Sequence, residues 1–281
     1  MKTYLDCIPC FFEQALRAGR MVTDDEMVLK RLFDELGQML GNISLESTPP
    51  ETGRLIYRMV SRVTGIPDPY EELKSESTAR ALELYPVMKK LIEEADDRLL
   101  TAIRVAIAGN VMDMGPNATF DIDTALKDIL TREFAICDYP AFKKYLADSE
   151  RVLYIGDNAG ETVFDRLLIE QMNKPAVYVV RDRPVINDAT YDDAIRAGLE
   201  NVATIVSSGT DAPGTVIPSC SPEFKRMLDE SDFVIAKGQG NYESLSNYPR
   251  PIFFLLKAKC RVIADDIGVT AGDIVLEGIN T

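Results

Sequence analysis

The segment Ile155–Glu161, with the sequence Ile-Gly-Asp-Asn-Ala-Gly-Glu, carries the side chains best suited to metal and phosphate chemistry. It directly follows Arg151–Tyr154, which predicts a short buried strand. Asp157 and Asn158 would then lie at the carboxyl edge of a sheet, where open α/β sheets bind ligands. The glycines would let backbone N–H groups approach an anion, and a helix expected over Thr162–Met172 would add its positive end. This combination suits a hard divalent cation beside a phosphate.

Four more polar segments each follow a predicted strand in the second half of the chain. They are Arg183–Asp188, Ser207–Thr215, Lys237–Glu243 and Lys257–Cys260. Parallel strands share a carboxyl edge, so these segments should meet in one composite site. Each also has a simpler explanation as a turn or a helix cap, because Asp and Asn favour both. These simpler explanations become less convincing when taken together, because all of them would have to hold at the same edge of the sheet.

Gly109–Asp113 ends a long helical region in the first half of the chain. Asn110 and Asp113 are three residues apart and would share a face if the helix continues. They could reach across to the sheet edge or form an ordinary end of a helix, and the sequence leaves both open.

The composition narrows the available chemistry. The 281 residues include no histidine, which excludes His-based triads and His-ligated zinc. Acid–base work would fall to Asp, Glu, Lys, Tyr, Cys or metal-bound water. The net charge of −14 argues against nucleic-acid and membrane partners, which need cationic surface. No apolar run is long enough to cross a bilayer, and none follows Met1 as in a signal peptide, so we expect a cytoplasmic protein.

Cys7 and Cys10 form a Cys-x-x-Cys pair near the start of the chain. The five cysteines are too few, and odd in number, for a secreted disulfide scaffold. A closed zinc site would need ligands from Cys137, Cys220 or Cys260, and a thioredoxin-like pair would follow a strand. We favour two buried small residues at the start of a helix, ahead of an accessory metal or redox site.

The period of the apolar residues divides the chain into two parts. Residues 1–108 predict helices, including a long helical region over 70–108 with a kink or break at Pro86. Residues 109–150 are expected to form a helical connection without a strong strand. The expected fold is α/β, with a Rossmann-like three-layer α/β/α domain and a mainly parallel sheet over 151–281. The expected strands are 152–155, 176–180, 203–206, 233–236, 252–256 and 262–264, and the expected helices of this domain include 162–172, 188–197 and 222–229.

Taken together, these motifs resemble the damage-control phosphatase family. The matching segments are Gly156–Glu161, Pro184–Thr190, Lys237–Glu243 and Phe254–Cys260, with Cys7–Cys10 near the start. The resemblance extends over nearly the whole chain, and the early cysteine pair is similar to the prokaryotic and archaeal branch. It implies a metal-dependent phosphatase with an α/β/α core, acting on sugar phosphates or on phosphorylated metabolites that are damaged or in excess.

The resemblance also implies roles for individual residues. Asp157, Asn158 and Asp188 match the positions that hold the metal, which is Mn²⁺, Ni²⁺, Co²⁺ or Mg²⁺ in the family. Lys237–Asn241 match the loop that lines the substrate phosphate, and Lys257 matches a late lysine that contacts it. The residues expected to bind substrate are Asn110, Asn187, Ser208, Gly209, Lys237, Gly238, Gln239, Gly240, Asn241 and Lys257.

The chemistry expected at this site is hydrolysis by water that the metal activates. Asp157, Asp188 and Lys257 would form the catalytic set, with Asp113 or Glu161 as the base. An aspartyl-phosphate on Asp157 is a less favoured route.

Two functions of other classes stay open. One is a protein that binds phospho-metabolites or metal without catalysis. The other is an S-adenosylmethionine-dependent carboxyl methyltransferase, an activity described for one relative, although no clear glycine-rich loop of that type follows the first predicted strand.

Overall fold

The computed structural model describes residues 1–109 and 131–281, and within them seven strands form one sheet. The order of the strands is β1-β7-β6-β5-β2-β3-β4. Neighbouring strands run parallel, except that β6 and β7 are antiparallel. The mainly parallel sheet predicted from the sequence is therefore confirmed. The strands are β1 (Phe134–Cys137), β2 (Val152–Ile155), β3 (Ala176–Val180), β4 (Thr204–Ser207), β5 (Val234–Lys237), β6 (Ile252–Lys257) and β7 (Ile274–Ile279).

The strand order reverses between β2 and β5. From β2 the chain moves outward on one side to β3 and β4, and it then returns to form β5 and β6 on the other side of β2. Both β2 and β5 are buried along their whole length. Open α/β sheets bind ligands at such a switch point, in the crevice beyond the carboxyl ends of the strands. The residues that follow β2 and β5 lie at this position.

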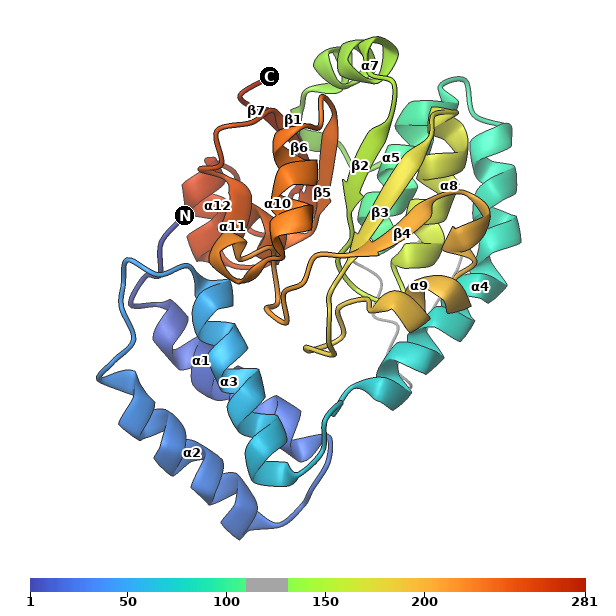
Figure 1. Cartoon of the computed structure of the whole chain (residues 1–281). Coiled ribbons are helices and arrows are strands. Elements are labelled where there is room, and N and C mark those ends of the chain that lie inside the picture. The colour runs from blue at the N-terminus through green and yellow to red at the C-terminus, as the bar shows by residue number, and fades with distance from the viewer. Residues whose placement is uncertain (110–130) are drawn as a thin grey trace.

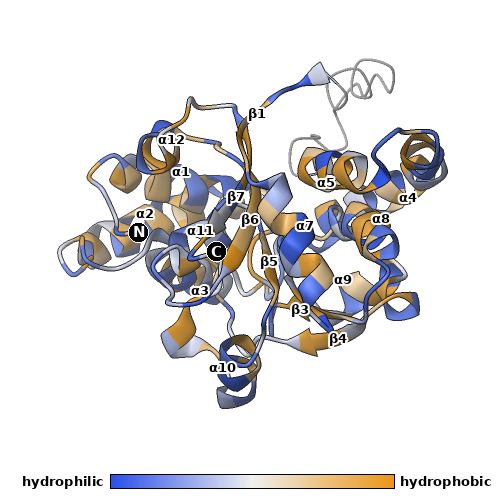
Figure 2. Ribbon diagram, turned by 90° about the horizontal axis from the view of Figure 1, so that it is seen from above, coloured by the Kyte–Doolittle hydropathy of each residue, from blue (hydrophilic) through white to orange (hydrophobic). Residues whose placement is uncertain are grey.

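Helices cover both faces of the sheet, as Figures 1 and 2 show. Successive residues of β2 point to opposite faces, so Val152 and Tyr154 belong to one core and Leu153 and Ile155 to the other. The helices on the first face are α4 (Glu71–Glu93), α5 (Arg98–Gly109), α7 (Tyr139–Asp148), α8 (Thr162–Met172) and α9 (Tyr191–Arg196). Those on the second are α10 (Pro222–Asp229), α11 (Gln239–Leu245) and α12 (Arg261–Ile267). The three-layer arrangement matches the prediction.

The first three helices form a small bundle with an apolar core of its own. They are α1 (Cys7–Arg20), α2 (Glu26–Leu40) and α3 (Pro49–Thr64), and they lie below the carboxyl edge of the sheet in Figure 1. Arg54 and Arg58 of α3 both form ion pairs with Asp211, in the loop that follows β4. Gly53 of the same helix lies against Pro213, where a Cβ would come within 2.9 Å of the ring. These contacts hold the bundle opposite the switch point.

The helical part differs from the prediction in one respect. Of the predicted kink or break at Pro86, the break is absent, because α4 passes through Pro86, and the chain turns at residues 94–97 before α5 begins. Pro86 is exposed, so the carbonyl group of Leu82, which a proline cannot bond, can accept a hydrogen bond from water. Both α4 and α5 pack in the core of the sheet, and Leu73 near the start of α4 also packs against the core of the bundle. The predicted division of the chain around 109–150 falls partly outside the described residues and stays a prediction.

Three strand predictions were wrong. β1 lies within 109–150, where no strand was expected, and β7 was missed. Residues 262–264 were expected as a strand but belong to α12, in which Ile263 and Ala264 are the buried residues. A run of three apolar residues fits the buried side of a helix as well as a strand, so periodicity could not separate the two. β1 has only four residues, which alternate between half-buried and exposed, and this pattern is too short to stand out.

Membrane insertion finds no support in the helices. Within residues 1–109 and 131–281, no helix is both long and apolar enough to cross a bilayer.

Candidate metal and phosphate site

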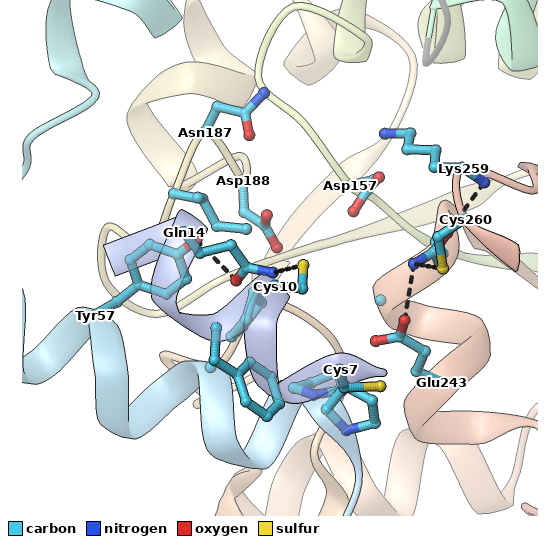
Figure 3. Close-up of a pocket in the computed structure, with 18 of the residues that line it drawn as sticks. Cys7, Cys10, Gln14, Tyr57, Asp157, Asn187, Asp188, Glu243, Lys259 and Cys260 are labelled. Atoms are coloured by element: carbon cyan, nitrogen blue, oxygen red, sulfur yellow. Dashed lines mark hydrogen bonds between the residues drawn. The ribbon is translucent and has the colours of Figure 1, made fainter. Parts of the chain in front are cut away.

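A cavity of about 860 Å³ lies between the helical bundle and the carboxyl edge of the sheet. Figure 3 shows Asp157 and Asp188 on the sheet side of this cavity and Cys7, Cys10 and Tyr57 on the bundle side. The volume is within the range of about 300–1,000 Å³ that is typical of small-molecule sites. The cavity can therefore hold a ligand the size of a phosphorylated metabolite.

Two loops at this edge are joined by backbone hydrogen bonds. The N–H group of Ala189 donates to the carbonyl oxygen of Asp157 at 2.8 Å, and the N–H group of Ala159 donates to that of Asn187 at 2.8 Å. The two bonds pair Asn158 with Asp188 in a short antiparallel bridge. Because one loop follows β2 and the other follows β3, this pairing brings together the three side chains that the sequence assigns to the metal.

Asn158 is oriented by the acids around it. Its Nδ2 donates to Asp157 Oδ2 at 3.2 Å and also to Glu161 Oε1. Both N–H groups of the amide therefore have an acceptor, which leaves the amide oxygen as the group available to a cation.

Asp188 is held by a buried arginine. Arg181, at the end of β3 and 2% exposed, donates from Nε to Asp188 Oδ2 at 2.7 Å. Its other nitrogens donate to Thr215 and Asn241 at 3.2 and 3.0 Å. Burial raises the pKa of Asp188 even though Arg181 lies beside it. Asp188 is therefore fixed in position but only partly compensated in charge.

Asp157 lies beside two other acids, Glu161 and Asp188. Burial, followed by the charges of Glu161 and Asp188, raises its pKa to about 8 against the opposing effects of Lys259 and Arg181. The carboxylate is 8% exposed and lines the cavity. A cation bound between Asp157 and Asp188 would reverse this effect by stabilising both ionised forms.

A second buried cluster lies beneath the cavity. Lys237 Nζ donates to Asp165 Oδ1 at 2.6 Å, to the Ala106 carbonyl oxygen at 2.8 Å and to Glu161 Oε2 at 3.2 Å. Asp165 also accepts hydrogen bonds from Tyr154 and Tyr178, both at 2.7 Å. The ammonium group thus has an acceptor for each of its three N–H bonds. Lys237 is fully buried and does not line the cavity, so its position suits charge compensation and not the predicted contact with phosphate.

The oxygen atoms of Asp157, Asn158 and Asp188 suit a divalent cation. Within the described residues, no three or more Cys, Asp and Glu side chains converge as ligands of one ion. Asp157 and Asp188 supply two carboxylates and Asn158 supplies an amide oxygen, which are hard ligands of the kind that Mg²⁺ and Mn²⁺ accept. Among the residues that the structure describes, the buried acids Asp157, Glu161, Asp165 and Asp188 lie around two buried bases, Arg181 and Lys237, and Glu243 is a further buried acid in the cavity lining. The excess negative charge fits a divalent ion.

Glycine is required at one position beside the acids. Gly238 follows β5 with φ at +77°, a conformation that residues with a side chain rarely adopt. A Cβ built there would lie 1.9 Å from Asp157 Oδ2. Its N–H group donates to the Leu255 carbonyl oxygen, so it is not available to a phosphate. Gly238 therefore makes room for the Asp157 carboxylate, whereas the sequence predicted a backbone contact with substrate.

The structure brings only some of the predicted substrate-binding residues to the cavity. Asn187, Gln239 and Gly240 line it, as do the three predicted metal ligands. Asn110 and Asp113 lie outside the described residues. The predicted residues that do not line the cavity are Glu161, Ser208, Gly209, Lys237, Gly238, Asn241 and Lys257.

Their positions explain why. Ser208 donates from its hydroxyl to the Val180 carbonyl oxygen, and Gly209 packs on Ser221. Asn241 is fully buried and donates to the carbonyl oxygens of Lys237 and Gly156. These polar residues follow strands, as predicted, but serve to connect the loops.

Several residues of the cavity wall were not assigned to the site from the sequence. Arg17 and Tyr57 come from the bundle, whereas Lys259 and Cys260 belong to the segment Lys257–Cys260 that was expected at the site, and both line the cavity. Cys7 is half-buried and Cys10 is exposed, so the expectation of two buried small residues is wrong, although α1 does begin at Cys7. Helical periodicity in a sequence predicts which residues face a core. It does not predict which exposed residues face another part of the chain.

Comparison with known proteins places the chain in a family. Residues 3–275 match the family model of the damage-control phosphatase ARMT1-like domain. The chain belongs to this family. It is 35% identical to a protein of Archaeoglobus fulgidus named damage-control phosphatase, over 96% of each chain. It is 34% identical to a damage-control phosphatase of Pyrococcus horikoshii, over 98% of this chain and 97% of the other. The crystal structure of a DUF89 family protein from Pyrococcus horikoshii matches with a TM-score of 0.92 at 32% identity, over the full length of both chains.

The charge on Asp157 makes the metal-free site unfavourable at neutral pH. Its pKa is about 8 in the folded chain and near 3.8 when unfolded, so the folded state binds the extra proton and stability falls as pH rises between these values. We expect Asp157→Asn to raise the melting temperature of metal-stripped protein at pH 8 but not at pH 4. The gain should be about 2–4 °C for each kcal/mol recovered. Asp24→Asn, at an exposed position, is the control, and equal melting temperatures of wild type and Asp157→Asn at pH 8 would contradict the assignment.

Lys237 should behave as a residue of the core. Lys237→Met removes the cation from Asp165 and Glu161 and should lower the free energy of unfolding by about 3–5 kcal/mol, the usual loss when one partner of a buried ion pair is removed. Denaturant titration measures the loss, with the exposed Lys30→Met as control. A variant as stable as wild type would show that Lys237 does not compensate these acids.

Proposed function

We propose that this protein is a metal-dependent phosphatase that hydrolyses small phosphorylated metabolites, either sugar phosphates or phospho-metabolites that are damaged or in excess. Membership of the damage-control phosphatase family supports a phosphatase. The observation that carries the proposal for this chain is the backbone pairing between the loops after β2 and β3, which sets Asp157, Asn158 and Asp188 on the wall of one cavity.

Asp157, Asn158 and Asp188 are the residues that we assign to the metal. Bound there, a divalent ion would act as a Lewis acid on a phosphate oxygen and lower the pKa of water. Mn²⁺, Ni²⁺, Co²⁺ and Mg²⁺ are all candidates. Arg181 keeps Asp188 in position through Nε. Asp157 must lose its proton for this role, so we expect uptake of the ion to release protons at neutral pH.

The phosphate group would be held by positive charge on the other side of the cavity. Lys259 lines the cavity, and its charge acts on both Asp157 and Asp188. Lys257 ends β6, the strand next to β5, at the same edge of the sheet. We assign Lys259 to the transferring phosphoryl group. Lys257 does not itself line the cavity, and its contact with the phosphoryl group is the role that the family resemblance implies. Asn187, Gln239 and Gly240 line the remainder of this side.

Glu161 is better placed to orient than to accept a proton. One of its oxygens accepts from Asn158 Nδ2 and the other from Lys237 Nζ. These bonds stabilise the carboxylate and turn the amide of Asn158, so we assign Glu161 to positioning this ligand. Asp113 stays a candidate for the general base and lies outside the described residues.

The bundle would select the substrate. Gln14, Arg17 and Tyr57 line the cavity opposite the acids, and Tyr57 donates from its hydroxyl to Gln14 Oε1 at 3.2 Å. Such a wall of amide, guanidinium and phenol groups suits a small polar molecule with several hydroxyl groups. We therefore propose small phosphorylated metabolites as the partners, and no nucleic acid or membrane.

Release of inorganic phosphate tests the proposal. Metal-stripped protein should release no phosphate from a panel of sugar phosphates until Mn²⁺, Ni²⁺, Co²⁺ or Mg²⁺ is added. Asp157→Ala and Asp188→Ala should lower kcat by a factor of about 10³ or more, because each removes a ligand of the ion that stabilises the transition state. Asp182→Ala, in the loop after β3 but outside the cavity lining, is the matched control.

The same assay separates the alternatives. Full activity in Asp157→Ala would overturn the site. Binding of phosphate esters without release of phosphate, under every metal, would favour a protein that binds without catalysis. If the protein neither binds phosphate esters nor releases phosphate, the methyltransferase alternative would be favoured. Binding of S-adenosylmethionine can then be measured by calorimetry.

Substitution of Lys257 or Lys259 should affect catalysis and not stability, in contrast to substitution of Lys237. Lys257→Met and Lys259→Met should retain the melting temperature of wild type while kcat/KM falls by about 10- to 100-fold, the range for loss of a charge-assisted hydrogen bond. Lys225→Met, at a surface position away from the cavity, is the control. Unchanged kinetics in both cavity-edge variants would contradict their assignment to the phosphate.

A further inference from the structure

We propose that Cys7 and Cys10 form a dithiol–disulfide site on the wall of the active-site cavity, which exchanges with low-molecular-weight disulfides of the glutathione class. Both side chains line the same cavity as Asp157 and Asp188. Figure 3 shows them on α1, across the cavity from Lys259 and Cys260. The phosphatase proposal leaves this pair without a role.

The backbone already has the geometry that the bond needs. Cys7 is the first residue of α1, and Cys10 follows in the same turn. Cα atoms three residues apart in a helix are separated by about 5 Å, and disulfides form at Cα separations of roughly 4.4–6.8 Å. The separation of the two residues within the first turn of α1 is therefore compatible with a disulfide.

A metal is a poorer explanation of the thiols. Cys260 lines the cavity as a third thiol, and its charge acts on both Cys7 and Cys10. Within the described residues, however, no three Cys, Asp and Glu side chains converge in the arrangement of an ion site. Two thiols on one helical turn suffice for a disulfide but not for a closed site of four ligands.

The exchange proceeds in two balanced steps. The exposed thiol of Cys10 loses its proton to water, and its sulfur attacks one sulfur of the small disulfide and releases one small thiolate. Cys7 then loses its proton and displaces the second small thiolate from the mixed disulfide. The protein gives up two electrons and two protons, and the small disulfide becomes two thiols. Burial raises the pKa of both cysteines, so the exchange is slow at neutral pH.

Oxidation of the cysteine pair would affect the substrate side of the cavity through the side chain of Gln14. Gln14 Nε2 donates to Cys10 Sγ at 3.1 Å, and Gln14 Oε1 accepts from the hydroxyl of Tyr57. When Cys10 Sγ turns to Cys7, Gln14 loses its sulfur acceptor. The amide then reorients on the wall that faces Asp188, so the oxidised and reduced proteins present different surfaces to a substrate.

The test uses the full-length protein with Cys137→Ser and Cys260→Ser, which leaves Cys7, Cys10 and the buried Cys220. The protein is equilibrated with oxidised glutathione, quenched in acid, alkylated and mapped by mass spectrometry. We expect the tryptic peptide of residues 3–17 to be lighter by two hydrogens and unalkylated, and to recover both thiols in dithiothreitol. This measurement does not depend on the phosphatase activity, so its failure and that of the proposed function are distinguishable.

Three results would overturn the proposal. In the first, the peptide of residues 3–17 stays reduced, although the exposed Cys137 of the wild-type protein becomes glutathionylated under the same conditions. The second is a stable glutathione adduct on Cys10 without an internal bond. The third, in the wild-type protein, is a bond from Cys10 to Cys260 in place of Cys7.

Activity gives the second measurement. We expect oxidation to change kcat/KM by about two- to tenfold, the range for loss of one neutral hydrogen bond, and Gln14→Leu to remove the difference between the two forms. Cys10→Ser should abolish the response to glutathione disulfide. Equal kcat/KM for the oxidised and reduced proteins would overturn the link between the cysteine pair and the substrate wall.

Discussion

Burial of four carboxylates beneath one cavity is the constraint that organises this protein. Asp157, Glu161, Asp165 and Asp188 would each be costly to bury in ionised form without compensation. Lys237 and Arg181 supply two positive charges, and the hydroxyls of Tyr154 and Tyr178 complete the shell of Asp165. The remaining negative charge faces the cavity at Asp157. A cation bound at Asp157 and Asp188, as we propose, would offset this charge and so link the stability of the fold to its chemistry.

The fold meets this constraint at the switch point of the sheet. Lys237 ends β5 and pairs with Glu161 and Asp165, which follow β2. Arg181 follows β3 and pairs with Asp188, in the loop after the same strand. The absence of a side chain at Gly238 makes space for the Asp157 carboxylate. Backbone bonds between the two loops then fix Asp157 and Asp188 relative to each other. The placement of the proposed metal ligands thus rests on main-chain contacts.

The bundle contributes a different kind of surface. Its own core holds α1, α2 and α3 together, and contacts from α3 to the loop after β4 hold the bundle over the sheet edge. The sheet side of the cavity is acidic and tightly bonded, whereas the bundle side carries Gln14, Tyr57 and the two thiols. The chemistry and the choice of substrate can therefore vary separately, because they depend on different elements of the fold.

The sequence by itself determined the α/β class, most strands of the sheet and the group Asp157, Asn158 and Asp188. Apolar runs of strand length and polar residues directly after them are local patterns, and local patterns survive in a single sequence. The strand β7, the helical state of Val262–Ala264 and the inward position of Lys237 did not follow from it. Only the tertiary structure decided which polar residues face the cavity and which compensate charge below it. Lysine, asparagine and serine serve either purpose, and the choice depends on neighbours that are far away along the chain.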